Sequence, residues 1–112
     1  GMSGGRRIQL LKKGVASMKC GFLLFNDLEE LDLVGPWEMI GMWGEYAGGP
    51  KERLMIAETD EAVTCTNGMR ILPHRTFAES PLLDYLLVPG GLGTRKEVAN
   101  EKLIQGLWVL CR

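Results

Sequence analysis

The apolar run KCGFLLF, residues 19–25, restricts the possible folds of this chain more than any other feature. A strand with one wet face alternates polar and apolar side chains, whereas this run is almost continuously apolar. Such a run is typical of a strand buried on both faces, as in a parallel sheet. The runs Arg53–Ala57 and Tyr85–Val88 have the same character. The sequence therefore predicts a parallel sheet with three central strands.

After the first of these runs, apolar residues recur at helical spacing, which predicts a helix. Gly35-Pro36 should kink or delay the helix near its start, because proline lacks the N–H that a helix interior needs. We expect both tryptophans of this segment to be core residues rather than a stacking platform. The apolar residues at helical spacing are Leu33, Val34, Trp37, Ile40 and Trp43.

A second helix is predicted from Asn100, which is a good N-cap, with Glu101 in the first turn, where the helix dipole favours a carboxylate. Strands that alternate with helices form β-α-β units with right-handed crossovers, so the predicted fold class is α/β. The apolar face of this helix would consist of Leu103, Ile104, Leu107, Trp108 and Cys111.

A small antiparallel ribbon is predicted between the second and third strands. Its two arms, Val63–Thr66 and Met69–Pro73, flank Asn67-Gly68, which is the strongest short hairpin signal. His74 follows the ribbon and is expected to be a surface or loop residue.

Length and charge limit the domain count and the classes of partner. The chain has 112 residues, enough for one domain, and 13 Lys+Arg against 14 Asp+Glu give a net charge of −1. This balance argues against nucleic-acid or membrane-surface binding, so a small molecule or a protein is expected as partner. We interpret residues 1–17 as a tag scar, Gly1, plus an N-terminal extension, and residues 18–112 as a partial α/β domain. With no signal peptide or spanning segment evident, we expect a cytoplasmic protein.

The three cysteines are far apart in the sequence. Cys20, Cys65 and Cys111 form no C-x-x-C pair, and His74 is the one histidine. We therefore expect no metal, no other cofactor and no disulfide framework. The preferred interpretation is three reduced cysteines that act as small hydrophobic residues, with a reactive thiol as the alternative.

In an open parallel sheet, ligands bind beyond the carboxyl ends of the strands, where the strand order reverses. This rule should bring the loop Asn26–Asp32 beside the loop Pro89–Thr94. The first loop supplies carboxylates, and the second supplies backbone amides next to Gly90-Gly91. The alternative for the paired glycines is a simple turn. A phosphate loop is excluded, because no Lys-Ser/Thr follows the glycines and no G-x-G-x-x-G pattern follows a predicted strand.

Four acids lie in the first loop, and one of them stands out. We expect Asp27, Glu29 and Glu30 to face water or to favour a helix start. Asp32 lies between two leucines, where apolar surroundings would raise the pKa of its carboxyl group and make it a proton donor. Helix N-capping is the alternative for Asp32.

The segments GFLLFNDLEELDLVGPWEMIG, TNGMRILPHRTF and DYLLVPGGLGTRKEVANEKLIQGLW together resemble the amino-terminal part of the ThiJ/PfpI family, in the class I glutamine amidotransferase-like superfamily. Within it, the spacing is most similar to the isonitrile hydratase-like branch and to the amidase-like domains of AraC-type regulators. The resemblance covers about Met18–Arg112 and implies a flavodoxin-like three-layer sandwich with a mostly parallel central sheet. It also implies thiol-dependent hydration or hydrolysis of a small polarised substrate.

Residue by residue, the resemblance implies that Asp32 is the acid that assists a catalytic cysteine and that Gly91 gives a backbone amide to the oxyanion hole. The family's nucleophile lies in a strand-to-helix elbow similar to VCTGA, and this sequence has no such segment. Cys111, on an apolar helical face, is not expected to replace it. We therefore expect the chain to be truncated before the elbow strand and inactive alone. The alternatives are a ligand-binding domain of an AraC-type regulator, or a non-catalytic fragment that oligomerises through its unpaired sheet edge as a homodimer or larger assembly.

Overall fold

The computed structural model describes residues 14–91, and the predicted second helix lies outside these residues. The three predicted central strands and the predicted ribbon are all present, whereas the short strand β5 was not predicted. In chain order the elements are η1 (Val15–Ser17), β1 (Lys19–Leu23), α2 (Glu30–Tyr46), β2 (Glu52–Ala57), β3 (Val63–Thr64), β4 (Arg70–Ile71), β5 (Arg75–Thr76), η2 (Phe77–Glu79) and β6 (Tyr85–Leu87).

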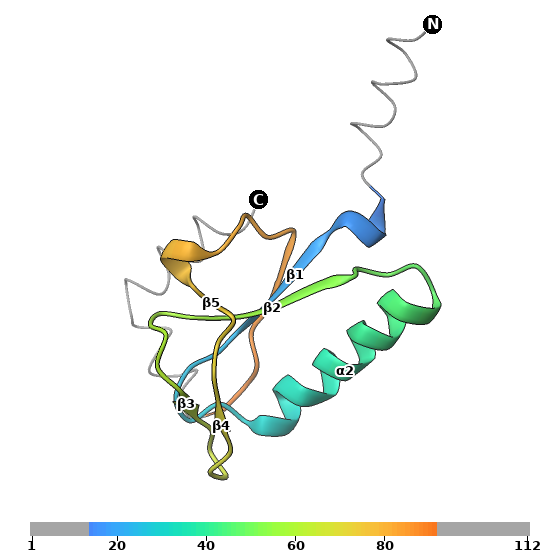
Figure 1. Cartoon of the computed structure of the whole chain (residues 1–112). Coiled ribbons are helices and arrows are strands. Elements are labelled where there is room, and N and C mark those ends of the chain that lie inside the picture. Colours follow the sequence, from blue (N-terminus) through green and yellow to red (C-terminus); the bar gives the residue numbers. More distant parts are fainter. Residues whose placement is uncertain (1–13, 92–112) are drawn as a thin grey trace, which may run out of the picture.

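The main sheet has four strands in the order β5-β2-β1-β6, and every neighbouring pair is parallel (Figure 1). Strand β1 pairs with β2 from Lys19↔Glu52 to Leu23↔Ile56, and with β6 at Phe22↔Leu87. The ribbon β3–β4 is a separate antiparallel pair. The fold is therefore α/β with a mostly parallel central sheet, and β1 and β6 are neighbours as predicted.

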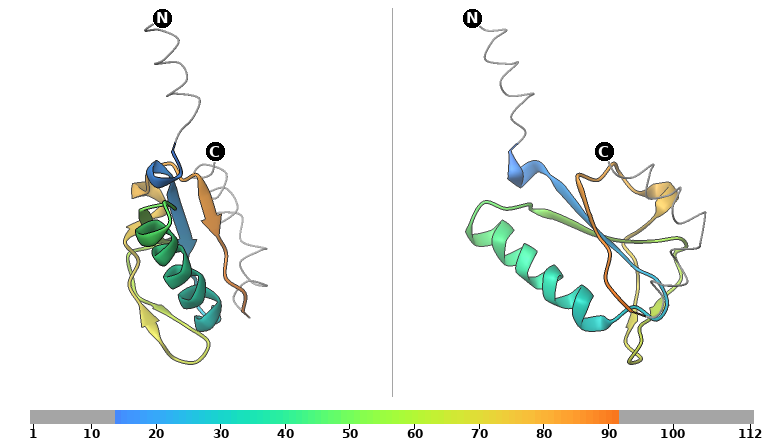
Figure 2. Two further views of the ribbon diagram at one scale, coloured as in Figure 1. Left: turned by 90° about the vertical axis from the view of Figure 1, so that its right-hand side faces the viewer. Right: turned by 180° about the vertical axis from the view of Figure 1, so that it is seen from behind.

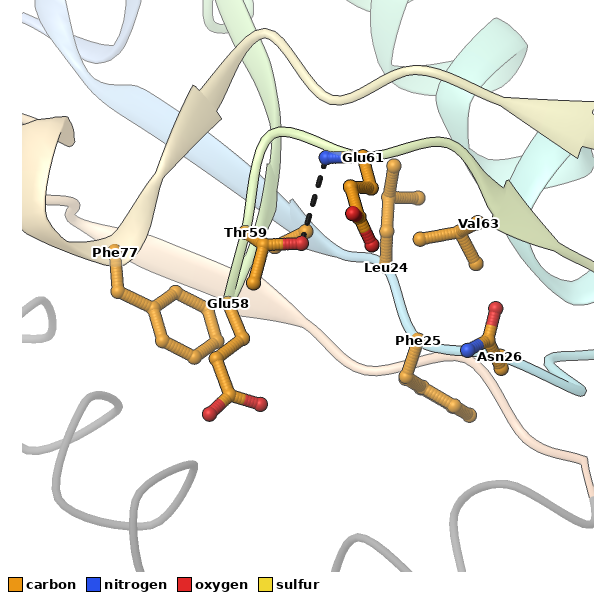
Figure 3. A pocket seen from close by; sticks show the side chains of 9 residues that line it. Leu24, Phe25, Asn26, Glu58, Thr59, Glu61, Val63 and Phe77 are labelled. Carbon is orange, nitrogen blue, oxygen red and sulfur yellow. Dashed lines mark hydrogen bonds between the residues drawn. The ribbon is translucent and has the colours of Figure 1, made fainter.

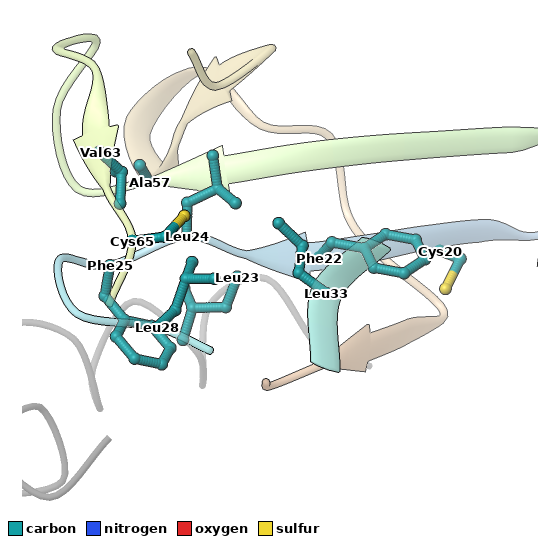
Figure 4. Close-up of a cluster of buried hydrophobic side chains, with 10 residues drawn as sticks. All are labelled: Cys20, Phe22, Leu23, Leu24, Phe25, Leu28, Leu33, Ala57, Val63 and Cys65. Carbon is teal, nitrogen blue, oxygen red and sulfur yellow. The ribbon is translucent and has the colours of Figure 1, made fainter. Parts of the chain in front are cut away.

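Helix α2 covers one face of this sheet (Figure 2). Phe22 of β1 meets Trp37 of α2 edge to face, with 5.0 Å between the ring centroids. Figure 4 shows the core that forms around β1 and the segments that follow it. Its buried members are Cys20, Phe22, Leu23, Leu24, Phe25, Leu28, Leu33, Ala57, Val63 and Cys65. A smaller cluster around Ile56 and Leu83 packs with Leu54, Phe77 and Leu86.

The expected delay of the helix at Gly35-Pro36 is wrong, because α2 begins at Glu30 and continues through both residues to Tyr46. Pro36 cannot donate the helical hydrogen bond to the carbonyl group of Asp32. Gly35 has no side chain for the proline ring to crowd, and nothing lies within 4 Å of a Cβ built there. Packing of Leu33, Trp37 and Ile40 against the sheet overrides the low helix propensity of this dipeptide.

Of the two tryptophans in α2, only Trp37 packs against the core. The prediction for Trp43 is wrong, because its side chain is 47% exposed. The Trp43 ring lies over Gly49, where an added Cβ would be 2.3 Å from the indole. The indole thus covers the turn after α2.

His74 is exposed, as predicted, and has an additional role in the sheet. Its Nδ1 accepts the backbone N–H of Met55 at 2.8 Å, and its ring stacks on Trp37 with 5.6 Å between the ring centroids. On the same indole, the guanidinium carbon of Arg53 lies 4.1 Å from the ring centroid. His74 therefore continues the edge pairing of β2 beyond the two residues of β5.

Strand β6 is an edge strand in the part of the chain that the structure describes. Its Tyr85 side chain is 54% exposed. Self-association through this edge stays a prediction. Within residues 14–91, no helix has the length and apolar character needed to cross a bilayer.

Candidate functional site

The two loops that the parallel sheet was expected to bring together are in contact. Leu28 and Gly91 form an isolated antiparallel bridge, and the N–H of Glu29 donates to the carbonyl oxygen of Gly90 at 2.8 Å. The loop after β1 therefore lies against the loop after β6, at the carboxyl ends of both strands. The predicted proximity is confirmed, while the chemical roles of Asp32 and Gly91 stay predictions.

Gly91 occupies a position that only glycine fits. Its φ is +134°, and a Cβ there would lie 2.5 Å from the carbonyl oxygen of Asp27 and 2.8 Å from the nitrogen of Glu29. The hydrogen bond at the bridge joins the N–H of Glu29 to the carbonyl oxygen of Gly90, so Leu28 and Gly91 are a pair without hydrogen bonds to each other. The N–H of Gly91 is therefore directed away from Leu28. This direction suits an amide that donates to a bound oxygen atom.

Asp32 lies in the first turn of α2, where the helix dipole favours a carboxylate. Its Oδ2 would be only 2.9 Å from a Cβ on Gly90, so the absence of a side chain at Gly90 leaves room for the carboxylate. The paired glycines therefore contribute in two ways: Gly90 admits the Asp32 carboxylate, and Gly91 makes the close backbone approach.

Two expectations for Asp32 are corrected. The Asp32 side chain is exposed, and of the two leucines beside it Leu33 is buried but Leu31 is 74% exposed. The apolar surroundings that we expected for Asp32 are therefore absent. The N-cap alternative is also wrong, since Glu29 occupies the N-cap position of α2. Sequence adjacency misled here because neighbouring helical residues point in different directions.

The loop that carries Leu28 is also fixed on its other side, by the ribbon. The N–H of Asp27 donates to the carbonyl oxygen of Thr64 at 2.8 Å, and the N–H of Thr64 donates to Oδ1 of Asn26 at 3.0 Å. The N–H of Thr66 donates to the carbonyl oxygen of Leu28 at 2.8 Å. Asp27 adopts a φ of +67°, which aspartate tolerates better than most residues. These contacts set the position of the backbone against which Gly91 lies.

Glu30 binds the tip of the ribbon, a role that the sequence did not reveal. Its carboxylate accepts the N–H of Asn67 at 2.9 Å, the side-chain amide of Asn67 at 3.1 Å and the N–H of Met69 at 3.4 Å. Desolvation raises the pKa of Glu30, but hydrogen bonds from its own N–H, Asn67 and Met69 outweigh it and leave the pKa lowered. The one signal in the sequence was the Asn67-Gly68 turn, whose backbone N–H groups need hydrogen-bond acceptors.

We expect the ribbon tip to loosen in acid. A lowered folded-state pKa means that Glu30 stabilises the ribbon above the ordinary carboxyl pKa, and that this contribution is lost as the pH falls through the lowered value. The amide resonances of Asn67 and Met69 should titrate together, with a midpoint below the ordinary glutamate value of 4.5. Glu30→Gln should remove this titration and speed hydrogen exchange at both amides several-fold, whereas Glu45→Gln should not. A midpoint at or above the ordinary value would contradict the assignment.

Neither cysteine in the described part of the chain is a suitable nucleophile. Cys20 and Cys65 are buried, as predicted, at 4% and 2% exposure. Burial raises the pKa of the Cys20 thiol, with partial opposition from the Arg53 charge. Burial also raises the pKa of the Cys65 thiol, and the nearby Glu30 and Glu29 carboxylates raise it further. Both thiols are therefore held in the protonated, unreactive form. Cys111 lies outside the described residues.

A cavity of about 250 Å³ lies at the carboxyl ends of β1 and β2 (Figure 3). Asp32 and Gly91 do not line it. Among residues 14–91, no group of three or more His, Cys, Asp or Glu side chains is arranged to hold a metal ion. The residues that line the cavity are Leu24, Phe25, Asn26, Ala57, Glu58, Thr59, Glu61, Val63 and Phe77.

Comparison with known proteins gives relatives in both sequence and structure, although no family model matches the chain. Isonitrile hydratase from Pseudomonas putida is 32% identical over 89 residues, which cover 79% of this chain and 36% of that protein. A ThiJ/PfpI family protein from Pseudomonas syringae superposes with a TM-score of 0.67 at 27% identity, over 86% of this chain and 40% of the other.

A DJ-1 superfamily protein from Salmonella typhimurium superposes with a TM-score of 0.69 at 20% identity, over 82% of this chain and 49% of the other, which shows a shared fold. The chain thus spans well under half of the length of the hydratase and of the Pseudomonas syringae protein. Sequence and fold agree that this chain belongs to the ThiJ/PfpI family and matches the amino-terminal part of its α/β domain.

Proposed function

We propose that this chain forms the acid and oxyanion sides of an isonitrile hydratase-like site for a small polarised substrate. The observation that carries the proposal is the contact between the two loops. It places the Asp32 carboxylate beside Gly90 and directs the N–H of Gly91 away from the bridge. The likeness to isonitrile hydratase from Pseudomonas putida supports the choice of substrate class.

Hydration of an isocyanide adds one water molecule and gives an N-substituted formamide. The terminal carbon must accept the oxygen of the water and one proton, the nitrogen takes the second proton, and a carbonyl group is formed. In the proposed site, Asp32 transfers the proton as a general acid and base, and the N–H of Gly91 stabilises negative charge on the developing oxygen. Because Cys20 and Cys65 are buried with raised pKa values, neither supplies the thiol that this chemistry uses. We propose that the purified chain binds the substrate class without turning it over.

Binding can be tested with an N-alkyl formamide, the product of isocyanide hydration. In a titration of the full chain followed by NMR, the amide resonance of Gly91 should shift more than those of the ribbon. Asp32→Asn should weaken binding about tenfold to a hundredfold, because a hydrogen bond to a charged group contributes about 1.5–3 kcal/mol. The matched control is Glu38→Gln, which removes an exposed carboxylate elsewhere on α2 and should leave binding unchanged.

Two results would contradict the proposal. Equal binding by the Asp32→Asn and Glu38→Gln variants would remove Asp32 from the site. Hydration of an alkyl isocyanide or conversion of an α-oxoaldehyde by the purified chain, abolished by Asp32→Asn, would confirm the acid but show that the chain already contains its nucleophile.

A further inference from the structure

The turn of the ribbon joins an asparagine to a glycine. Asn67 is exposed at the free end of the ribbon, which projects beyond the sheet (Figure 1). Gly68 follows with a φ of +98°, and nothing lies within 4 Å of a Cβ built there. Asparagine is a thermolabile residue, and it reacts most readily before glycine, where no side chain shields the next backbone nitrogen. The hairpin signal of the sequence is therefore also a candidate modification site.

The reaction at such a site is the loss of the side-chain amide of Asn67. The backbone nitrogen of Gly68 gives up its proton and forms a bond to Cγ of Asn67, and the bond from Cγ to Nδ2 breaks. Nδ2 takes up that proton and leaves as ammonia, which gives a five-membered succinimide. One water molecule then opens this ring and yields aspartate or isoaspartate. The reaction needs no oxidant, no reductant and no co-reactant besides water.

In the folded chain, both nitrogen atoms that take part are held by acceptors. Nδ2 of Asn67 donates to Oε1 of Glu30 at 3.1 Å and to Oε1 of Glu29 at 3.4 Å. The N–H of Gly68 donates to the carbonyl oxygen of Cys65 at 3.0 Å. Attack on Cγ requires the N–H of Gly68 to release Cys65 and the Asn67 side chain to be free to turn. The bonded turn therefore reacts only after a local opening.

The product cannot return to the same contacts. Aspartate at position 67 replaces the Nδ2 donor by a carboxylate oxygen, beside the carboxylates of Glu29 and Glu30. Donors are lost and three like charges meet, which is unfavourable. Isoaspartate also adds one carbon to the backbone of the turn, and the ladder between β3 and β4 has only two residue pairs to hold it. Modification therefore separates the ribbon tip from the start of α2.

We propose that Asn67 is a deamidation site and that the Glu30 carboxylate sets the rate of its reaction. While Glu30 holds the tip, Asn67 is protected; once Asn67 has reacted, Glu30 repels it, so the change runs in one direction. Through Thr64 and Thr66 the ribbon is bonded to the backbone and side chains of residues 26–28, and modification loosens this contact. The inference requires no catalytic group, so it is separate from the proposed function.

The test is peptide mapping of the full chain during incubation at neutral pH. Trypsin cleaves after Arg53 and Arg70, and residues 54–70 contain Asn67 as their one side-chain amide, so the mass of this peptide reports its conversion directly. The free peptide 54–70 gives the unprotected rate. We expect the full chain to react roughly tenfold more slowly than the free peptide, because its rate follows the population of opened turns.

Glu30→Gln should raise the rate in the full chain roughly threefold to tenfold, because it removes a charged acceptor of hydrogen bonds. The matched control is Glu45→Gln, which removes an exposed carboxylate from the last turn of α2 and should leave the rate unchanged. Asn26, the one side-chain amide of tryptic residues 20–51, is followed by aspartate and serves as an internal reference that should stay unmodified.

The effect of the product is measured separately with Asn67→Asp, which imitates one of the two products. Asn67→Ala is its control, because it removes the bonds of Nδ2 without adding a charge. The N–H of Met69 donates to Oε2 of Glu30 at 3.4 Å, and its hydrogen exchange should be faster in Asn67→Asp than in Asn67→Ala.

The proposal is overturned if the full chain and the free peptide react at the same rate, because the fold then gives Asn67 no protection. It is also overturned if Glu30→Gln and Glu45→Gln react equally slowly, since Glu30 then does not set the rate. Equal exchange of the Met69 amide in the two Asn67 variants would overturn it as well, because Glu30 then does not repel the modified residue.

Discussion

Replacing Gly91 by alanine is expected to be among the most damaging single changes to this domain. The added Cβ would lie 2.5 Å from the carbonyl oxygen of Asp27, 2.8 Å from the nitrogen of Glu29 and 3.0 Å from Cα of Leu28. All three are backbone atoms, and the segment that carries them is hydrogen-bonded to the ribbon, so it cannot move aside cheaply. Together with the strained φ of +134°, the clash should lower the free energy of unfolding by about 2–4 kcal/mol. Denaturant unfolding measures this loss directly.

The matched control for Gly91 is Gly48→Ala. Gly48 also has a positive φ, +75°, but nothing lies within 4 Å of a Cβ built there. Its replacement should therefore cost only the conformational term, about 1 kcal/mol. If the two variants lose the same stability, the close approach between Gly91 and the Asp27–Glu29 backbone is not a feature of the protein in solution.

Leu33→Ala is expected to have the second large effect. Leu33 is 0% exposed and is the first buried residue within α2. Truncation of a fully buried leucine removes apolar burial and leaves a cavity, which costs about 2–5 kcal/mol. Because Leu33 anchors the turn that carries Asp32, the variant should also bind the formamide probe more weakly under conditions where it remains folded.

Leu31→Ala provides the comparison for Leu33. Leu31 lies on the same turn of α2 but is 74% exposed, so its truncation should change the free energy of unfolding by no more than about 0.5 kcal/mol. Equal losses for both leucines would mean that α2 presents a different face to the sheet. Thermal and denaturant unfolding of the two variants side by side decides the question.

Much of the sheet could be predicted from the sequence because its signals are local. The apolar runs at β1, β2 and β6 indicate strands of a parallel sheet, and Asn67-Gly68 indicates the turn between β3 and β4. The adjacency of the two site loops then follows from the topology of a parallel sheet rather than from any single motif. Asp32 stands out within its loop because it lies between two leucines, and its role as the acid, like the role of Gly91, is implied by the family resemblance.

Other features depend on contacts between distant residues and left no local signal. Strand β5 has two residues, too few for a periodic pattern, and His74 extends its pairing with β2 through a side chain. Glu30 was expected to face water or to favour the helix start, yet its partners are Asn67 and Met69, far along the chain. The continuity of α2 through Pro36 depends on packing against the sheet, which outweighs a local preference.

The short segment 26–29 lies between the ribbon and the glycine loop and is bonded to both. A displacement of Thr64 or Thr66 would therefore be transmitted through the backbone of Asp27 and Leu28 to Gly91. The position of the Gly91 amide, which we propose as the oxyanion donor, therefore depends on the ribbon. A partner that binds the ribbon would therefore change the affinity of the proposed site for a carbonyl ligand, without contacting that ligand. The ligand would in turn change the affinity of the ribbon for the partner by the same factor.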